Sequence, residues 1–301
     1  MTHGAASAET VERASRAAAH HLRVRPAELS VELLDLRRSV RPVFLARAGD
    51  RKIVVKQYVE GAFLDGAARR LAAVAAIDPR MEVPRLLGVE PTDLLLLMSF
   101  VRGVPLLDRL AGTPAEAATA SERAGAAIAI LHGSPIAFPE RKDRRDTLDG
   151  SARMVAKYGR AAREHAARAG DVSRQRTVDE DAARADAGFR LAERLLAGLA
   201  DGPLVPTHGD LGPGQLLDCG PRLAILDFDW AVHAERARDL GFYLAKLTRE
   251  VPGAGAALSE RFLAGYATEG ELPPRHAIDA YTLVILLRKL ARATRPPAST
   301  A

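Results

Sequence analysis

The first hundred residues alternate between the apolar spacing of a helix and that of a strand. This spacing predicts a polar amphipathic helix, three strands, an Ala-rich helix and a further buried strand, at about 9–22, 29–36, 43–48, 52–58, 63–77 and 93–101. Gly49 and Asp50 form a short turn between the second and third strands, so we expect these two strands to pair as a hairpin. Such a mixture predicts a small α+β layer.

Beyond Pro105 the pattern becomes mainly helical. Helices are predicted at about 114–131, 151–167, 178–199, 238–250, 255–266 and 275–294, with a short β patch at 215–228. The simplest architecture is an α+β, two-lobed fold. Residues 1–102 form a small β-rich N-lobe with a leading helix, and residues 103–301 form a mostly helical C-lobe. We expect the lobes to meet near 100–105, with a cleft between them.

Composition and charge limit the compartments and the classes of partner that are possible for this chain. The 301 residues are 48% hydrophobic and 27% charged, and no run approaches the roughly 18 apolar residues of a membrane span. The single cysteine, Cys219, fits a reducing compartment, so we expect a cytoplasmic protein without a membrane partner. The net charge is +5, but basic residues are interleaved with acids, as in 141–146, and only 5% of residues are aromatic. We therefore expect no nucleic-acid partner.

The segment 208–215, followed by Leu226-Asp227-Phe228-Asp229, has the strongest chemical pattern. Phosphoryl transfer needs one carboxylate to orient the attacking hydroxyl, together with oxygen ligands for a metal. Asp210 lies in a Gly- and Pro-rich loop, and the amide oxygen of Gln215 is a hard ligand suited to Mg²⁺. Asp227 ends a strand-like run, which directs its carboxylate to the same site. The joint spacing predicts a kinase.

The segment 207–244 resembles the aminoglycoside phosphotransferase and choline kinase superfamily, whose members have a protein-kinase-like fold. Three motifs carry the resemblance: His208-Gly209-Asp210, Leu226-Asp227-Phe228 and Arg238-Asp239-Leu240. Weaker similarity lies upstream, to the lysine-bearing strand, the hinge and a Leu-His helix end, at 54–58, 98–103 and 130–132. These landmarks occur in the family's order over about 52–244.

The resemblance implies an ATP- and Mg²⁺-dependent transfer of the γ-phosphate to a hydroxyl of a small molecule. Asp210 would be the catalytic base and Asp227 the principal magnesium ligand, with Gln215 in the second metal-ligand position. Lys56 would pair with the α- and β-phosphates.

Other residues would have supporting roles. The backbone of Ser99, Phe100 and Val101 would hold the adenine. His208 and Asp239 would hold the catalytic loop in place. Asp229 would either assist in binding the metal or contact the residues that bind it.

The chain departs from the family pattern at three places. Gln215 stands where a kinase catalytic loop has Asn. The segment 37–42, where a phosphate-covering loop is expected, contains arginines but no glycine. The helix after Lys56 has no obvious glutamate for the lysine; Glu60 and Asp65 are candidates, and Asp65 is more simply a helix N-cap.

The acceptor is open among sugars, amino alcohols, aminoglycosides and other hydroxylated natural products. Basic residues outnumber acidic ones over 231–301, which weighs against a strongly cationic acceptor. The main alternative is a pseudokinase, a nucleotide-binding module without turnover, which the departures from the family pattern motivate. A sugar-nucleotide glycosyltransferase with Asp227-Phe228-Asp229 as its metal motif leaves 208–215 and Lys56 unexplained, and the histidines lack a paired spacing for a metallohydrolase.

Overall fold

The computed structural model describes residues 7–34 and 42–293. The chain divides into two compact units. The first contains the described residues up to Val104 together with Pro135–Pro139 and Leu217–Trp230, and the second contains Pro105–Ser134, Glu140–Leu216 and the described residues from Ala231 onward. Each unit thus includes segments that are distant in the sequence.

The first unit is built on a five-stranded sheet in the order β1-β2-β3-β5-β4, in which all neighbouring strands are antiparallel. Gly49 has a φ of 57° and makes the turn between β2 and β3, so the predicted hairpin is confirmed. The helices and strands of this part are α1 (Ala8–Leu22), η1 (Pro26–Glu28), β1 (Ser30–Leu33), β2 (Val43–Ala48), β3 (Arg51–Gln57), α2 (Gly61–Ala73), η2 (Val74–Ala76), β4 (Leu86–Glu90) and β5 (Leu95–Ser99).

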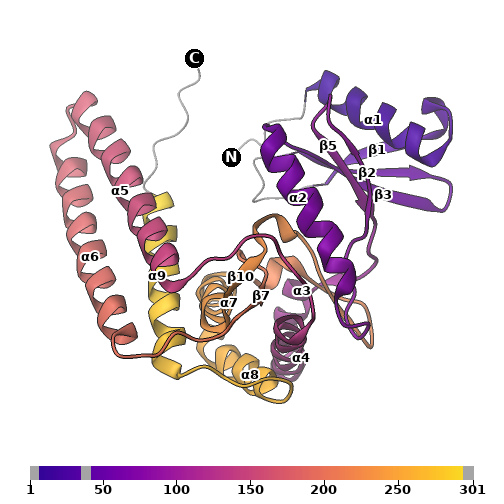
Figure 1. Cartoon of the computed structure of the whole chain (residues 1–301). Coiled ribbons are helices and arrows are strands. Elements are labelled where there is room, and N and C mark those ends of the chain that lie inside the picture. The colour runs from indigo at the N-terminus through magenta and orange to yellow at the C-terminus, as the bar shows by residue number, and fades with distance from the viewer. Residues whose placement is uncertain (1–6, 35–41, 294–301) are drawn as a thin grey trace. The chain divides into compact units, whose positions relative to one another are not determined.

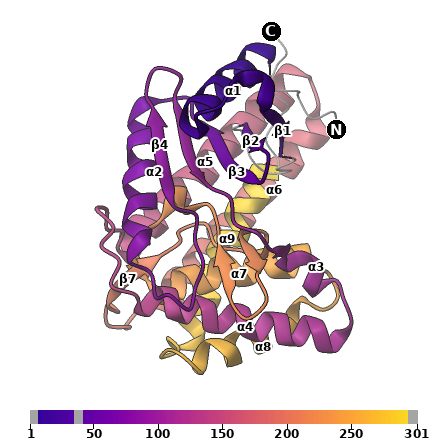
Figure 2. The same cartoon turned by 90° about the vertical axis from the view of Figure 1, so that its right-hand side faces the viewer.

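Helices α1 and α2 cover opposite faces of this sheet (Figures 1 and 2). Small residues of α1, among them Ala14 and Ala18, pack on Phe44 and Val55 of the strands. Leu64 and Leu71 of α2 pack on the other face, with Leu96 and Tyr58. Because side chains alternate along a strand, Lys56 lies on the face that α2 covers.

The segment Leu217–Trp230 belongs to this first unit. Its strands β8 (Leu216–Asp218) and β9 (Leu223–Ile225) are neighbours in a three-stranded sheet with the short β6 (Val104–Pro105). The turn η4 (Phe228–Trp230) follows β9 and contacts α2. This path delivers Asp227 and Asp229 to the β3–α2 side of the unit.

The second unit is mainly helical. Its elements are α3 (Leu106–Leu110), α4 (Pro114–Gly133), α5 (Arg144–Arg168), α6 (Val172–Leu196), β7 (Leu204–Thr207), η3 (Pro213–Gln215), β10 (Val232–Glu235), α7 (Arg236–Glu250), α8 (Gly255–Ala267) and α9 (Arg275–Ala293). Helices α4 and α8 pack closely because each has a glycine at the contact. A Cβ on Gly125 or on Gly265 would lie 1.9 Å from a backbone oxygen of the other helix, so both glycines are required.

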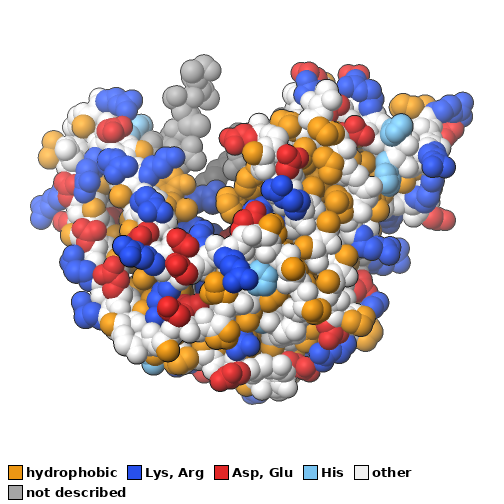
Figure 3. All heavy atoms as spheres, in the orientation of Figure 1, with side chains coloured by type: hydrophobic (Ala, Val, Ile, Leu, Met, Phe, Trp, Pro, Cys, Tyr) orange, Lys and Arg blue, Asp and Glu red, His pale blue; other side chains and the backbone are white. Residues whose placement is uncertain are grey.

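Helices α5 and α6 form an antiparallel hairpin beside α9 (Figure 1). Helix α5 begins at Arg144, earlier than the sequence pattern predicts, because the Asp143 side chain accepts a hydrogen bond from the Asp146 N–H and caps it. On the face drawn in Figure 3, acidic and basic side chains are interleaved over this hairpin. Several form ion pairs, such as Arg163 with Asp179 at 2.6 Å.

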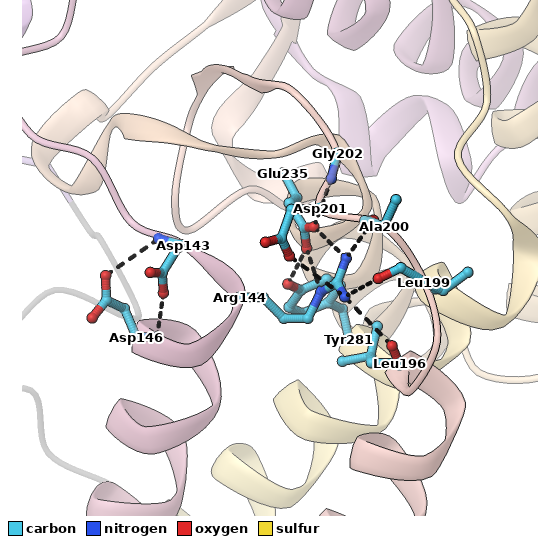
Figure 4. Close-up of polar contacts among 10 residues, drawn as sticks. All are labelled: Asp143, Arg144, Asp146, Leu196, Leu199, Ala200, Asp201, Gly202, Glu235 and Tyr281. Atoms are coloured by element: carbon cyan, nitrogen blue, oxygen red, sulfur yellow. Dashed lines mark hydrogen bonds and ion pairs between the residues drawn. The ribbon is translucent and has the colours of Figure 1, made fainter.

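A buried charge network joins the base of this hairpin to the strand before α7 (Figure 4). Arg144 Nη2 lies 2.6 Å from Glu235 Oε1, and the same guanidinium donates to the carbonyls of Leu199 and Ala200 at 3.1 Å. Tyr281 of α9 donates its hydroxyl to Glu235 Oε2 at 2.5 Å. Glu235 is buried, and its hydrogen bonds from Arg144 and Tyr281 outweigh the effect of burial and lower its pKa.

The second unit also contains two short strands that the sequence pattern did not predict. Strands β7 and β10 pair antiparallel, with Val232 opposite Thr207. The pair holds the start of the 208–215 loop beside the start of α7. In the part of the chain that the structure describes, no helix is long and apolar enough to cross a membrane. The predicted α+β class is confirmed, with a β-rich first unit and a helical second unit.

Candidate active site

Lys56 of β3 binds two carboxylates of the Asp227-Phe228-Asp229 segment. Its Nζ lies 2.6 Å from Asp227 Oδ1 and 2.8 Å from Asp229 Oδ2. Lys56 and Asp229 are each 7% exposed, which excludes a loose surface pair. Burial alone would lower the pKa of Lys56, but the charges and hydrogen bonds of the two aspartates raise it above its ordinary value. The ammonium group is therefore held as a cation.

Asp229 is fixed from both of its carboxylate oxygens. While Oδ2 accepts from Lys56, Oδ1 accepts from the Tyr58 hydroxyl at 2.7 Å, and the Asp229 carbonyl accepts from Arg70 Nη1 of α2 at 3.1 Å. Tyr58 and Arg70 are site residues that the sequence analysis missed. A signal was present for Tyr58, because residues two apart on a strand share a face with Lys56.

These contacts replace Glu60 and Asp65, the two candidate partners that the sequence offered for Lys56. Asp65 is exposed within α2 and is not the helix N-cap, a position that Glu60 occupies. The acidic partners of Lys56 come instead from the segment after β9.

Asp227 is the more accessible of the two aspartates, with 47% of its side chain exposed. Its φ of 66° lies in the left-handed region, which Asp tolerates better than most residues. One oxygen contacts Lys56, and the partial exposure leaves the carboxylate accessible to a ligand. Backbone strain of this kind often occurs at functional positions.

The predicted hinge residues begin at Ser99, the last residue of β5, and continue beyond the strand. Ser99 is anchored in the sheet: its N–H donates to the Arg85 carbonyl at 2.9 Å and its Oγ accepts from the Arg85 N–H at 2.8 Å. The ring of Phe100 lies 5.4 Å from Lys52 Nζ, and Val101 follows outside the strand. The arginine-containing segment predicted to cover the phosphates, 37–42, lies outside the described residues apart from Pro42.

In the second unit, the fully buried Asp239 holds the backbone of the 208–215 loop. Its carboxylate accepts from the His208 N–H at 2.5 Å and from the Gly209 N–H at 2.9 Å. His132 Nε2 lies 3.5 Å from Asp239 Oδ2, while its Nδ1 lies 2.9 Å from the Tyr266 hydroxyl. Burial alone would raise the pKa of Asp239, but the hydrogen bond from His132 and the nearby charges lower it. Asp239 is therefore an ionised acceptor for the loop.

His208 lies within the loop and is completely buried. Its Nδ1 accepts a hydrogen bond from the Asp210 N–H at 3.4 Å. Gly209 between them has a φ of 82°, which glycine adopts without strain. Asp239 and His208 thus accept hydrogen bonds from the successive backbone N–H groups of residues 208, 209 and 210.

Asp210 is held by Lys246 of α7, which the sequence analysis did not select. Lys246 Nζ lies 2.9 Å from Asp210 Oδ1 and 2.5 Å from the Asp210 carbonyl. Lys246 is nearly inaccessible, whereas 37% of the Asp210 side chain is exposed. The signal for Lys246 was its spacing, since it follows Asp239 by two helical turns and so shares its face. Gly212 is needed here, because a Cβ would lie 2.3 Å from Lys246 Cδ.

Gln215 ends the η3 turn of the same loop. Its Oε1 is buried and accepts no hydrogen bond from any described residue. An uncompensated buried amide oxygen is costly unless a ligand occupies it. The position therefore fits a hard cation, for which an amide oxygen is a suitable ligand.

The structure brings the predicted site residues together in two sets. Lys56, Asp227 and Asp229 meet in the first unit. The set in the second unit is the loop 208–215 with Asp239. The set in the first unit contains a lysine and two carboxylates, which are groups that can bind phosphates and a metal. The set in the second unit contains a partly exposed carboxylate on a loop that hydrogen bonds hold in place.

A family model described as the phosphotransferase enzyme family matches residues 31–278. The chain belongs to this family. The resemblance expected from sequence is thereby confirmed, and with it the class of small-molecule kinases that transfer phosphate to an alcohol group. The comparison with curated proteins finds no match.

Three solved structures illustrate the likeness. Choline kinase LicA from Streptococcus pneumoniae is 14% identical, with a TM-score of 0.67, covering 96% of this chain and 91% of that one. Aminoglycoside phosphotransferase APH(3'')-Id from Streptomyces rimosus, in complex with ADP and streptomycin, is 20% identical, with a TM-score of 0.60 and coverages of 86% and 92%. Macrolide 2'-phosphotransferase MphH from Brachybacterium faecium is 21% identical, with a TM-score of 0.60 and coverages of 97% and 100%. These likenesses show that this family member has the kinase-like fold.

Proposed function

We propose that the protein transfers the γ-phosphate of ATP to a hydroxyl group of a small molecule, with Mg²⁺ as the metal. The observation that carries the proposal is Asp210, a partly exposed carboxylate on a loop held by buried charges. A general base has to reach the acceptor hydroxyl in a fixed geometry, and this arrangement supplies both access and rigidity. The ADP in one structurally similar phosphotransferase supports a nucleotide as the donor.

In the proposed reaction, Asp210 accepts the proton of the acceptor hydroxyl as the hydroxyl oxygen attacks the γ-phosphorus. The bond between the γ-phosphorus and the bridging oxygen breaks, and ADP departs with that electron pair. The products are a phosphate monoester, ADP and the proton on Asp210, which is later released to water. Lys246, in contact with Asp210, keeps the carboxylate oriented.

Lys56 would contact the α- and β-phosphates, and the backbone of Ser99, Phe100 and Val101 would hold the adenine. Asp229 would act by holding Lys56, and this contact supports a positioning role for it next to the metal ligands. His208 and Asp239 act through the backbone of the loop.

Asp227 and Gln215 would hold Mg²⁺. A bound magnesium ion supplies charge neutralisation of the phosphate oxygens. The exposed carboxylate of Asp227 supports the first ligand, and the Gln215 oxygen, which has no hydrogen-bond partner in the described part of the chain, supports the second. Gln in place of Asn keeps the amide oxygen as the ligand atom, on a side chain that is one methylene group longer.

The proposal is tested by incubating the protein with ATP, Mg²⁺ and a panel of sugars, amino alcohols, aminoglycosides and hydroxy acids, and following phosphate esters by ³¹P NMR. We expect one class to be phosphorylated, with Asp210→Asn slower by about 10²–10⁴-fold. Asp186→Asn, at an exposed position of α6, is the matched control. Nucleotide binding without transfer to any member of the panel would contradict the proposal and favour the pseudokinase.

A further inference from the structure

Four cationic side chains of α7 and α9 interact with Asp210 in the second unit. Lys246 binds Asp210 directly, and the Asp210 charge also acts on Arg238, Arg288 and Lys289. Helices α7 and α9 pack against each other, as Figure 1 shows. The Arg238 and Arg288 guanidinium carbons lie 5.0 and 5.4 Å from the centre of the same ring, that of Phe242. We call Arg238, Lys246, Arg288 and Lys289 the cationic cluster.

The cationic cluster lacks enough acidic partners among the described residues. Asp210 is paired with Lys246, and both oxygens of Asp239 accept backbone N–H groups. Arg238 is 5% exposed, yet among the described residues its Nε and Nη1 have no hydrogen-bond partner, and Nη2 donates only to the Gly209 carbonyl. The cluster therefore retains excess positive charge.

Further cations lie around the cluster. Lys142, Arg249 and Arg292 act electrostatically on its members or are acted on by them. Burial, followed by the charge of Arg238, lowers the pKa of Arg288 to about 10. Burial, opposed by Asp210 but reinforced by Lys246, Arg249 and Arg292, lowers the pKa of Lys289 to about 8. In both residues burial and the neighbouring cations outweigh the opposing charge of Asp210.

This arrangement differs from the basic residues elsewhere in the same unit. On the α5–α6 hairpin, arginines such as Arg163 and Arg184 form ion pairs with nearby acids, and the drawn face in Figure 3 shows mixed charge. The cationic cluster is more buried and is concentrated around the proposed base. Buried, unpaired charge costs stability, and an anionic ligand would remove that cost.

We propose that the acceptor is itself an anion, a hydroxyl compound with a carboxylate or phosphate group that Arg288 and Lys289 bind. These two residues are half-buried and so remain accessible, while Arg238 and Lys246 add positive charge behind them. The inference rests on the proposed function, because it places the anion beside Asp210. It makes polycationic aminoglycosides poor acceptors for this chain.

The test compares sugars that share a ring and differ in charge: glucose, glucosamine, glucuronate and glucose 6-phosphate. The enzyme is the full chain with ATP and Mg²⁺, as wild type, Arg288→Gln, Lys289→Gln and the exposed control Arg190→Gln. We expect the anionic sugars to have at least a tenfold higher kcat/KM than glucose. Each cluster variant should raise the KM of the anionic acceptor about tenfold and leave the KM of ATP within twofold. Phosphorylation of glucose or glucosamine at equal or higher kcat/KM would overturn the inference.

A second result would also overturn it. If Arg288→Gln and Lys289→Gln raised the KM of ATP and left that of the acceptor unchanged, the cationic cluster would serve the nucleotide phosphates.

A binding measurement separates this inference from the proposed function. Calorimetric titration with glucuronate and with inorganic phosphate, without nucleotide, should show binding to wild type and Arg190→Gln that weakens about tenfold in the two cluster variants. Such binding without any phosphoryl transfer would sustain the anion site and contradict the proposed function. Transfer without a preference for anions, or no anion binding, would contradict the anion site alone.

Discussion

Lys56 donates a hydrogen bond to Asp229 across 2.8 Å, and both side chains are buried. The two residues are 173 positions apart in the chain. The pair joins the strand β3 to the segment that also contains Asp227. Acids that follow β9 thus hold the lysine, and no acid of α2 contacts it among the described residues.

The first prediction concerns this pair. Asp229→Asn should lower the free energy of unfolding by roughly 1–3 kcal/mol, because the buried ammonium loses one of its two charged partners. It should also weaken ATP binding about tenfold, because Lys56 is no longer fixed. Denaturant unfolding and calorimetry measure the two effects.

The exposed Asp65, one of the two candidate partners that the sequence offered for Lys56, provides the control. Asp65→Asn should change the unfolding free energy by less than about 0.5 kcal/mol. Loss of stability or ATP affinity in Asp65→Asn, with Asp229→Asn unaffected, would refute the assignment of Asp229.

The second prediction concerns Asp239 and pH. Asp239→Asn should lower the free energy of unfolding by roughly 2–3 kcal/mol at pH 7, because two backbone N–H groups lose a charged acceptor. The folded-state pKa of Asp239 lies below the ordinary 3.8, so its stabilisation is complete above about pH 5 and is lost as the pH falls through the folded-state value. The difference in unfolding free energy between the variant and wild type should therefore be constant from pH 8 to 5 and shrink below about pH 4. A gap that widened on acidification would contradict this.

The third prediction concerns Arg144, the centre of the network in Figure 4. Arg144→Met should destabilise the protein by about 3 kcal/mol, because it leaves the buried Glu235 without its charged partner. Arg145→Met, one residue along and 90% exposed, should have an effect of less than about 0.5 kcal/mol. Thermal and urea unfolding of both variants check the difference, and equal losses would show that Glu235 does not depend on Arg144.

The fourth prediction concerns the effect of the Lys289 charge on stability. The pKa of Lys289, about 8, lies below the ordinary 10.5. At pH 7 the charged side chain therefore destabilises the ligand-free folded protein relative to the unfolded chain. Solvent screens this partly exposed group, which reduces the effect of its charge. Lys289→Gln should therefore raise the free energy of unfolding by about 1 kcal/mol at pH 7. The gain should disappear as the pH rises from 8 to 10.5, because above about pH 8 native wild type has lost the Lys289 proton while its unfolded chain still carries it. Urea unfolding at pH 7, 9 and 10 measures it; destabilisation at pH 7 would mean that Lys289 has a structural partner.

The fold was predictable where the sequence signal was local. Strand β2 has the predicted bounds, and α8 ends one residue beyond its prediction. Strands β7 and β10 were missed because each has four residues and is stabilised by pairing with a distant segment. The early start of α5 depends on a capping box, a signal that the apolar spacing does not contain.

The candidate site divides in a similar way. Asp210 and Asp227 were identifiable because their motifs are contiguous in the chain. The partners of Lys56 and Asp210 were not, because tertiary packing brings Asp229 to Lys56 and Lys246 to Asp210. The excess of basic residues at the C-terminal end was visible in sequence, but its concentration beside Asp210 depends on how α9 packs on α7.

The most direct test measures ATP binding and phosphoryl transfer in parallel for Asp210→Asn and Asp227→Asn, with Asp186→Asn as the control. If Asp210 is the base and Asp227 a metal ligand, Asp210→Asn should bind ATP with Mg²⁺ as tightly as wild type while transfer falls about 10²–10⁴-fold. Asp227→Asn should lose the part of ATP affinity that depends on Mg²⁺, as well as transfer. Full transfer activity in Asp210→Asn, with its fold intact, would contradict the proposed mechanism.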